Sequence, residues 1–298
     1  WDPSNYSDSG SGTLDLFGAT RSSVNTIFAQ LVVEVGPENV ADIAHRMGIR
    51  SPLETPEGAV PCSITLGTLE VTPLEMAEAY ATWAALGVRH QATPVHQIRG
   101  PNRDLVERTD RRGRQVMEEN EALQAIYAMR QVVCCGTASG AVSLSSETYF
   151  GKTGTTDDDS DVWFCGASSE VSTCVWVGHP NGRVPMPGAT GGEVAAPIWN
   201  AFMASIHGET EPEPFEEPDF TGDVIKPSPV PAPSPSPTEE KEEKEEEPKE
   251  EEEPSQEPSP SPPPSPPPTT PPPTTPPPSS PPPTTPPPRG DGGGGADP

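Results

Sequence analysis

The sequence predicts an α+β domain, an antiparallel sheet flanked by helices, followed by a tail without a folded core. Two periodicities and one shift in composition lead to this prediction. Helical spacing of apolar residues comes first, three short β-rich runs joined by polar turns follow, and a helical segment closes the region. Strands that follow one another through short turns pair antiparallel, whereas alternating strands and helices favour a parallel sheet. We expect one folded domain in residues 1–207.

The shift in composition lies near residue 207. Residues 208–298 hold 32 of the 44 prolines, with 21 acidic against 5 basic residues, whereas residues 1–207 hold 24 acidic and 13 basic residues. Pro-Pro-Pro-Thr-Thr repeats remove backbone donors and the Glu-rich block repels itself, so this part cannot bury enough apolar surface to fold. We expect a disordered acidic, Pro-rich tail over residues 208–298, an extended spacer or a docking segment for other proteins.

The first half of the domain predicts helices. Apolar residues recur at helical spacing over residues 14–35, up to a Gly-Pro stop signal, and a short helix follows over residues 38–47. Residues 63–87 hold a third helical stretch. In that stretch Thr72 precedes a proline, which is the typical order of an N-cap and a first helical position.

The second half predicts a sheet between two helices. In chain order we expect a strand over residues 93–99, a charged hairpin tip over 102–114, a helix over 118–133, strands over 148–156, 162–167 and 173–178, and a helix over 194–206. The three consecutive strands are separated by polar turns, which is typical of hairpins. They form the expected antiparallel sheet.

Charge and histidine spacing exclude several classes of function. A net charge of -27 without a basic cluster gives no surface that attracts nucleic acid or anionic lipid. No run of about 18 apolar residues predicts a membrane span, and the chain starts at Trp1 rather than at Met, so we expect a truncated N-terminus. The five histidines show no i, i+4 pair and no partner at ligand spacing, so we expect no metal site.

Residues 1–207 contain twelve arginines but only one lysine, Lys152. It lies in the run Gly-Lys-Thr-Gly-Thr-Thr at residues 151–156. A phosphate-binding loop also ends in Gly-Lys-Thr, but it needs a glycine where this sequence has Ser146, and a helix should follow instead of an acidic loop. We therefore interpret the run as a strand that carries a functional lysine.

A lysine on an edge strand beside a serine hydroxyl supplies a fixed positive charge, which stabilises the anions that form in acyl transfer. Thr153 and Thr155 alternate with Gly154, so their hydroxyls line one side of the strand and the glycine lets a ligand approach the backbone. The run resembles the Lys-Thr-Gly motif of the active-site serine enzymes that recognise penicillin.

A second motif of that family, Ser-x-Asn, occurs at residues 23–25. Further matching pieces are Trp-x-Pro-x-Asn-Tyr at 1–6, Leu-Gly-Thr-x-Glu-Val-Thr-Pro-Leu-Glu-Met-Ala at 66–77, Gly-Thr-Ala at 136–138, Asp-x-Trp-Phe-x-Gly at 161–166 and Val-Trp-Val-Gly at 175–178. In this order and spacing, residues 1–206 resemble the C-terminal two-thirds of the transpeptidase domain of a class A, high-molecular-mass penicillin-binding protein of actinobacterial type.

The resemblance implies catalytic roles for three residues. Ser23 would relay protons between the nucleophile and the leaving group or incoming amine, and Asn25 would hold the acyl-side amide of the substrate. Lys152 would hold Ser23 in place. The implied reaction is acyl transfer from a D-Ala-D-Ala stem peptide of peptidoglycan through a serine ester to an amine, without a cofactor.

The resemblance also implies ligands and the residues that bind them. Peptidoglycan stem peptides and β-lactam antibiotics are the implied ligands, with other cell-wall synthesis or division proteins as further partners. Thr153 and Thr155 would contact the carboxylate of the terminal D-alanine or of the β-lactam, within a binding strand that also includes Gly154 and Thr156. The backbone N–H of Thr155 would form half of the oxyanion hole.

One motif of the family is absent from the printed chain. The resemblance places the nucleophile motif, Ser-x-x-Lys, upstream of Ser-x-Asn, where only 22 residues precede Ser23. A glycosyltransferase domain and a membrane anchor are implied further upstream, with the domain outside the cytoplasmic membrane. Two other functions stay open: a non-catalytic module that binds β-lactams or muropeptides, and a wall-spanning spacer protein.

Two cysteines are predicted to face each other. If residues 167–172 turn a hairpin, Cys165 and Cys174 lie at opposite positions on neighbouring strands. An exported protein meets an oxidising compartment, so we expect a disulfide between them. Cys62 with Cys134 or Cys135 is a second possible bridge.

Overall fold

A computed structural model describes residues 1–6, 12–109, 112–208 and 210–221, all of which belong to one compact unit, Trp1–Val230. From residue 222 onwards the expected tail lies outside the described residues. The elements are α1 (Leu16–Ser22), α2 (Asn25–Val35), α3 (Pro37–Met47), the 3-10 helix η1 (Cys62–Leu66), α4 (Pro73–Ala84), β1 (Val88–Arg89), β2 (Gln97–Arg99), β3 (Leu105–Arg108), β4 (Arg114–Gln115), α5 (Glu119–Cys135), β5 (Phe150–Thr155), β6 (Asp161–Ala167), β7 (Ser172–Gly178), the π-helical turn η2 (Gly191–Ala195) and α6 (Ala196–His207).

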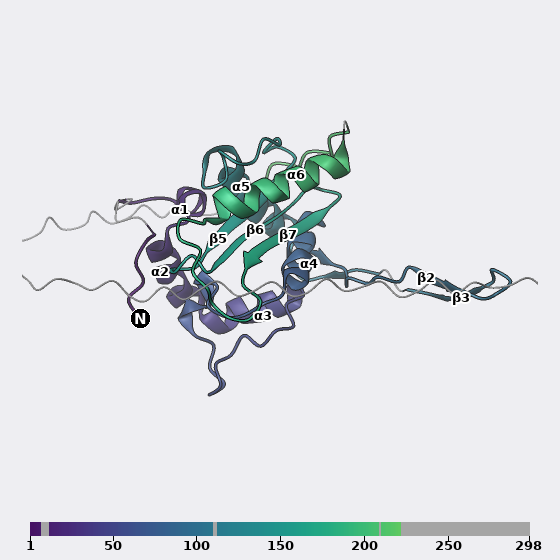
Figure 1. Cartoon of the computed structure of the whole chain (residues 1–298), viewed down its shortest axis with the longest axis horizontal. Helices are drawn as coiled ribbons and strands as arrows, with labels where there is room; N and C mark the ends of the chain where they lie inside the picture. Colours follow the sequence, from purple (N-terminus) through teal and green to yellow (C-terminus); the bar gives the residue numbers. More distant parts are fainter. Residues whose placement is uncertain (7–11, 110–111, 209, 222–298) are drawn as a thin grey trace, which may run out of the picture. The chain divides into compact units, whose positions relative to one another are not determined.

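The central sheet has three antiparallel strands in the order β5, β6, β7 (Figure 1). Lys152 on β5 lies opposite Cys165 on β6, which lies opposite Cys174 on β7. Within the described residues β5 pairs on one side only, so it is an edge strand. The predicted α+β class is confirmed.

Helices cover both faces of this sheet. On one face Phe164 of β6 packs against Trp199 of α6, with 4.9 Å between the ring centroids. On the other face Phe150 of β5 stacks on Tyr80 of α4 at 6.1 Å, in a cluster that includes Leu123 of α5. Since successive strand residues point to opposite faces, each face has its own core, and the sheet is held between α6 and the pair α4 and α5.

The helix predicted over residues 14–35 is in fact two helices. α1 ends and α2 begins around Ser23, which adopts a left-handed backbone conformation with φ 53° and ψ 52°. The Ser23 N–H donates to carbonyls of the last turn of α1, and the buried Val24 then precedes α2. Left-handed residues other than glycine are uncommon. Helical periodicity on both sides of the break conceals it in the sequence.

Residues 93–114 also differ from the prediction. The strand expected over residues 93–99 is shorter, and the charged region expected as a hairpin tip contains two strands. β2 pairs with β3, with Ile98 opposite Glu107, and β1 pairs with β4, with Val88 opposite Gln115. Charged and amide residues on these short strands give little strand propensity, so the sequence shows only the turn.

Cysteine pairing confirms one prediction and contradicts another. A disulfide joins Cys165 to Cys174 at directly opposite positions on β6 and β7. The bridge from Cys62 to Cys134 or Cys135 is wrong, because the latter two are bonded to each other and Cys62 is a free thiol. Cys62 begins η1, which packs on α2 and α3, whereas the pair ends α5, which packs on α1, α4 and β5.

The packed chain continues beyond His207, where the sequence predicts the end of the domain. The Phe215 ring lies against Phe150, 5.4 Å between centroids, and is buried. The backbone of Asp219 donates to and accepts from the side chain of Asn120, at 2.8 and 2.9 Å. An acidic, Pro-rich composition does not reveal these contacts, because they join residues that are far apart in the sequence.

A buried carboxylate connects α4 to the loop after α3. Thr72 and Glu75 form the capping box that begins α4, as the predicted N-cap requires. The Glu75 carboxylate also accepts from the N–H groups of Arg50 and Ser51, at 2.8 and 2.9 Å. Burial opposes the charge, but the hydrogen bonds from Thr72, Ser51 and Arg50 prevail and lower the pKa of Glu75 to about 2. Glu75 thereby stabilises the fold as a carboxylate.

We predict that Glu75→Gln lowers the free energy of unfolding at neutral pH by about 3 kcal/mol, because a native pKa near 2 against an ordinary value of 4.5 corresponds to that much differential stability. The contribution of a group with a lowered pKa is complete above pH 4.5 and is lost as the pH falls towards 2. Urea unfolding between about pH 7 and about pH 3 measures it. The exposed Glu34→Gln is the control, and equal loss in both variants contradicts the assignment.

Candidate active site

Lys152 and Ser23, which are 129 residues apart in the sequence, meet in the structure. The Lys152 ammonium on β5 donates to the Ser23 Oγ at 2.7 Å and to the Thr153 carbonyl oxygen at 2.9 Å. The left-handed break between α1 and α2 is what places the Ser23 side chain at the strand. The contact between these two side chains that the family resemblance implies is therefore present.

The environment of Lys152 weakens its hold on the proton. The side chain is half-buried between β5 and the end of α1, and its hydrogen-bond acceptors are a hydroxyl and a carbonyl rather than a carboxylate. Burial without a neutralising partner disfavours the ammonium, and it lowers the pKa of Lys152 to about 8. The group is still mainly a cation at pH 7, yet it can release a proton to a neighbour at modest cost.

Thr153 and Thr155 point to the opposite face of β5 from Lys152, since they alternate with it along the strand. The Thr153 hydroxyl lies 2.7 Å from the hydroxyl of Thr137, which follows α5. The Thr155 hydroxyl accepts from the Gly191 N–H of η2 at 3.0 Å. Both hydroxyls are held in place by groups outside the sheet, as a carboxylate-binding strand requires.

The other predicted binding and catalytic residues are Gly154, Thr156 and Asn25. Gly154 lies between the two threonines, and the Gly191 backbone approaches it closely because Gly191 lacks a side chain: a Cβ at Gly191 would lie 2.6 Å from the Gly154 carbonyl oxygen. The Thr156 hydroxyl accepts from the Asp161 N–H at 3.0 Å, so it turns into the loop that joins β5 to β6. The Asn25 side chain lines the cavity while its amide donates to the Ser4 carbonyl at 2.9 Å.

A cavity of about 670 Å³ runs along the outer side of β5 and collects most of the predicted residues. It is lined by Ser4, Asn5, Tyr6, Ser22, Ser23, Asn25, Thr137, Gly140, Ala141, Thr153, Thr155, Asp157, Thr190, Gly192, Glu193 and Pro197. Ser23, Asn25, Thr153 and Thr155 of the sequence prediction are among them, whereas Lys152, Gly154 and Thr156 are not. A cavity of this size, lined mainly by polar residues, accommodates a peptide-sized ligand.

Several lining residues were not identified as functional from the sequence. Tyr6 and Thr137 belong to the matching pieces at residues 1–6 and 136–138, so their place in the same cavity as Ser23 and Thr153 could have been inferred from those matches. Glu193 gives no sequence signal, because a Thr-x-x-Glu pattern before an apolar run is typical of a helix start. Its place in the cavity follows only from the fold.

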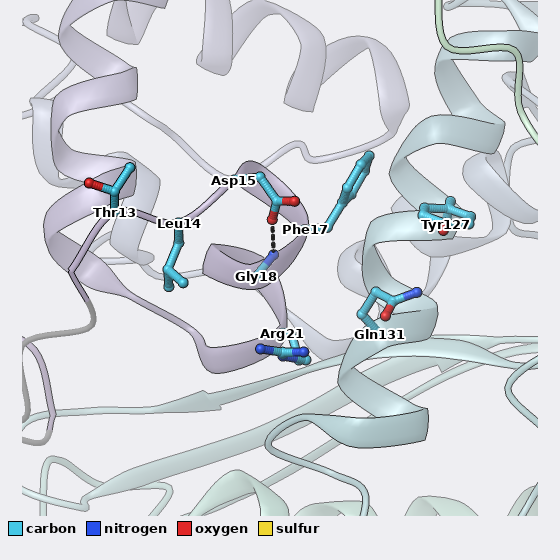
Figure 2. A pocket seen from close by; sticks show the side chains of 8 residues that line it. All are labelled: Thr13, Leu14, Asp15, Phe17, Gly18, Arg21, Tyr127 and Gln131. Carbon is cyan, nitrogen blue, oxygen red and sulfur yellow. Dashed lines mark hydrogen bonds between the residues drawn. The ribbon is translucent and has the colours of Figure 1, made fainter. Parts of the chain in front are cut away.

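A second cavity, of about 470 Å³, lies between α1 and α5 (Figure 2). Its lining residues are Thr13, Leu14, Asp15, Phe17, Gly18, Arg21, Tyr127 and Gln131. Asp15 uses its carboxylate to cap α1 at the Gly18 N–H, 2.7 Å away, as the dashed line in Figure 2 shows. None of the predicted site residues lines this cavity, so the candidate site is the one beside β5.

In the part of the chain that the structure describes, no group of three or more histidine, cysteine, aspartate or glutamate side chains is arranged to hold a metal ion. Among the same residues, every helix is too short or too polar to span a bilayer.

Comparison with known proteins adds independent evidence. The chain is 33% identical over 219 residues to penicillin-binding protein 1A of Aquifex aeolicus, which covers 73% of this chain and 29% of that protein. Penicillin-binding protein 1A of Neisseria cinerea is 31% identical over 208 residues, which is 68% of this chain and 26% of that protein. The chain thus spans less than a third of the length of these curated relatives.

Solved structures of penicillin-binding proteins are also similar to this chain. PonA1 of Mycobacterium tuberculosis, solved in complex with penicillin V, superposes with a TM-score of 0.67 at 29% identity and covers 76% of this chain and 65% of that chain. Residues 1–204 match the family described as penicillin binding protein transpeptidase domain. With this match over more than half of its length, the chain belongs to the transpeptidase domain family of penicillin-binding proteins.

Proposed function

We propose that this chain carries the proton-relay and substrate-binding half of a serine D,D-transpeptidase that crosslinks peptidoglycan. The observation that carries the proposal is the 2.7 Å hydrogen bond from the Lys152 ammonium to Ser23 at the wall of a polar cavity. Membership of the penicillin-binding transpeptidase family supports it.

The proposed reaction has two acyl transfers. In the first, a nucleophilic serine forms a C–O bond to the penultimate D-alanine carbonyl, the C–N bond to the terminal D-alanine breaks, and the leaving amine takes a proton through Ser23. In the second, an acceptor amine forms a C–N bond, the ester C–O bond breaks, and the amine proton returns through Ser23 to the serine. Lys152 holds Ser23 and stabilises the negative charge that develops.

We propose that the substrate binds to β5 and to the junction between α1 and α2. Thr153 and Thr155 bind the terminal carboxylate of the stem peptide or of a β-lactam, Gly154 gives it access to the backbone, and the Thr155 N–H forms part of the oxyanion hole. Asn25 holds the acyl-side amide after releasing its contact with Ser4. PonA1, solved in complex with penicillin V, supports penicillin as a ligand of this domain.

The nucleophile is proposed to come from residues that the chain does not contain. No serine stands three positions before any lysine of the 298 residues, and the curated relatives are more than three times as long as the matched part. We propose that a longer protein supplies Ser-x-x-Lys, together with a glycosyltransferase domain and a membrane anchor that keeps this domain outside the cytoplasmic membrane. That protein would also be the one that meets other cell-wall synthesis proteins.

We predict that fluorescent penicillin fails to label the 298-residue chain covalently but labels the same chain extended upstream through a Ser-x-x-Lys motif. In the extended protein, Lys152→Ala should slow acylation about a hundredfold, or about 3 kcal/mol, because a preorganised charge is removed from the site. Stopped-flow acylation measures the rate. Arg108→Ala on β3, remote from the cavity, is the control, and a Lys152→Ala rate within about twofold of the parent rate rejects the site.

A pH profile tests the charge on Lys152 separately. Because its pKa is lowered to about 8, the ammonium is present below that pH and is lost above it, so acylation of the extended protein should fall by about tenfold per pH unit on the alkaline side. Lys152→Arg keeps its charge throughout this range and should remove the alkaline fall, at a lower maximal rate. If the fall persists in Lys152→Arg, another group causes it.

A further inference from the structure

We propose that Glu193 binds the ammonium group of the acceptor amine, so that the cavity beside β5 contains an acceptor subsite as well as an acyl site. This inference rests on the proposed function. It assigns the acceptor end of the cavity, which neither the predicted residues nor the family motifs in the sequence identify, to a cationic ligand.

The formally charged residues of the cavity lining are all acidic. Its sixteen residues include two acids, Asp157 and Glu193, and no arginine, lysine or histidine. Lys152 is not among the lining residues, and its ammonium is engaged with Ser23 and the Thr153 carbonyl. Negative formal charges at one end of a cavity attract a cation there.

The Glu193 carboxylate is held at a defined position relative to the substrate-binding strand. The Thr190 hydroxyl accepts from the Glu193 N–H at 3.1 Å and donates to its Oε2 at 3.3 Å. The next backbone N–H in that turn, from Gly191, donates to the Thr155 hydroxyl at 3.0 Å. Glu193 is thus two residues from a direct contact with the strand that would bind the substrate carboxylate.

Nearby positive charge is already paired elsewhere. The Arg183 guanidinium donates to the Asp158 carboxylate at 2.8 Å and to the Ser160 hydroxyl at 3.2 Å, outside the cavity lining. In the described part of the chain, no ion pair involves Glu193 or Asp157. The negative field at this end also acts on Tyr6, whose pKa is raised first by the charge of Asp159 and further by Glu193.

The second acyl transfer of the proposed reaction needs a ligand of this kind. Its acceptor is an aliphatic amine, which near neutral pH arrives as an ammonium and releases one proton to solvent before it attacks the ester. The leaving D-alanine and a β-lactam instead present a carboxylate to the strand. Glu193 therefore acts on the binding of the acceptor and leaves acylation unaffected, as a specificity residue of the second step.

The substitution Glu193→Gln separates charge from structure. Glutamine serves as well as glutamate at the third position of a helix start, so the turn at Thr190 is kept while the charge is removed. The experiment uses the longer protein with its Ser-x-x-Lys motif, a thioester donor, and Nα-acetyl-lysine amide as the cationic acceptor. Hydroxylamine, which is uncharged near neutral pH, is the neutral acceptor, and Glu107→Gln on β3 is the charge-matched control.

We expect Glu193→Gln to raise the KM for acetyl-lysine amide by about threefold to fivefold, the size of a solvent-accessible ion pair. The kcat, the hydroxylamine reaction and the acylation rate with fluorescent penicillin should stay within about twofold. High salt should raise the parent KM to that of the variant, and Glu107→Gln should behave as the parent.

Other outcomes overturn the inference in distinguishable ways. An unchanged KM for the cationic acceptor, with normal acylation, rejects Glu193 as the acceptor subsite and leaves the proposed function intact. Loss of acylation or of the hydroxylamine reaction in Glu193→Gln assigns the residue a structural role through Thr155, which also rejects the inference. A longer parent protein that fluorescent penicillin does not acylate at all rejects the proposed function itself.

Discussion

The hydrogen bond between the Lys152 ammonium and the Ser23 hydroxyl is the contact on which the arrangement of the site depends. It joins an edge strand to the junction of two helices across 129 residues of sequence. α5 makes this possible because it packs against both α1 and β5. A desolvated ammonium whose acceptors are neutral is costly, so the surrounding packing has to hold both side chains in place.

Two glycines, Gly136 and Gly191, allow the elements around the site to pack this closely. At Gly136, just after α5, a Cβ would lie 2.4 Å from the Arg21 carbonyl oxygen, so a larger residue would push α1 and with it Ser23 away from the strand. At Gly191 a Cβ would lie 2.4 Å from the Trp163 carbonyl oxygen, and η2 could not approach β5. Both walls of the cavity are therefore positioned by backbone contacts that only glycine permits.

The sequence predicts those features of this molecule that depend on residues close together in the chain. The N-cap at Thr72, the three strands of the sheet and the single lysine can all be read from spacing and residue type. The break at Ser23 could not, because the left-handed conformation is imposed by packing and leaves helical periodicity intact on either side. The place of Glu193 could not either, since its turn reaches the sheet through the contacts of Gly191 with Thr155 and Trp163. What escapes the sequence is long-range contact.

The disulfide between Cys165 and Cys174 has a consequence for the site because of where it lies. Cys165 is the cross-strand partner of Lys152 and is bonded to the residue opposite it on β7. A slip of one residue in a strand moves every side chain to the other face, and would exchange Lys152 with Thr153. The bridge opposes slippage between β6 and β7 at the rung that carries Lys152. The stacking of Phe150 on Tyr80 fixes which face of β5 is turned inward. The Lys152 ammonium therefore stays on the side of the strand where it can bind Ser23.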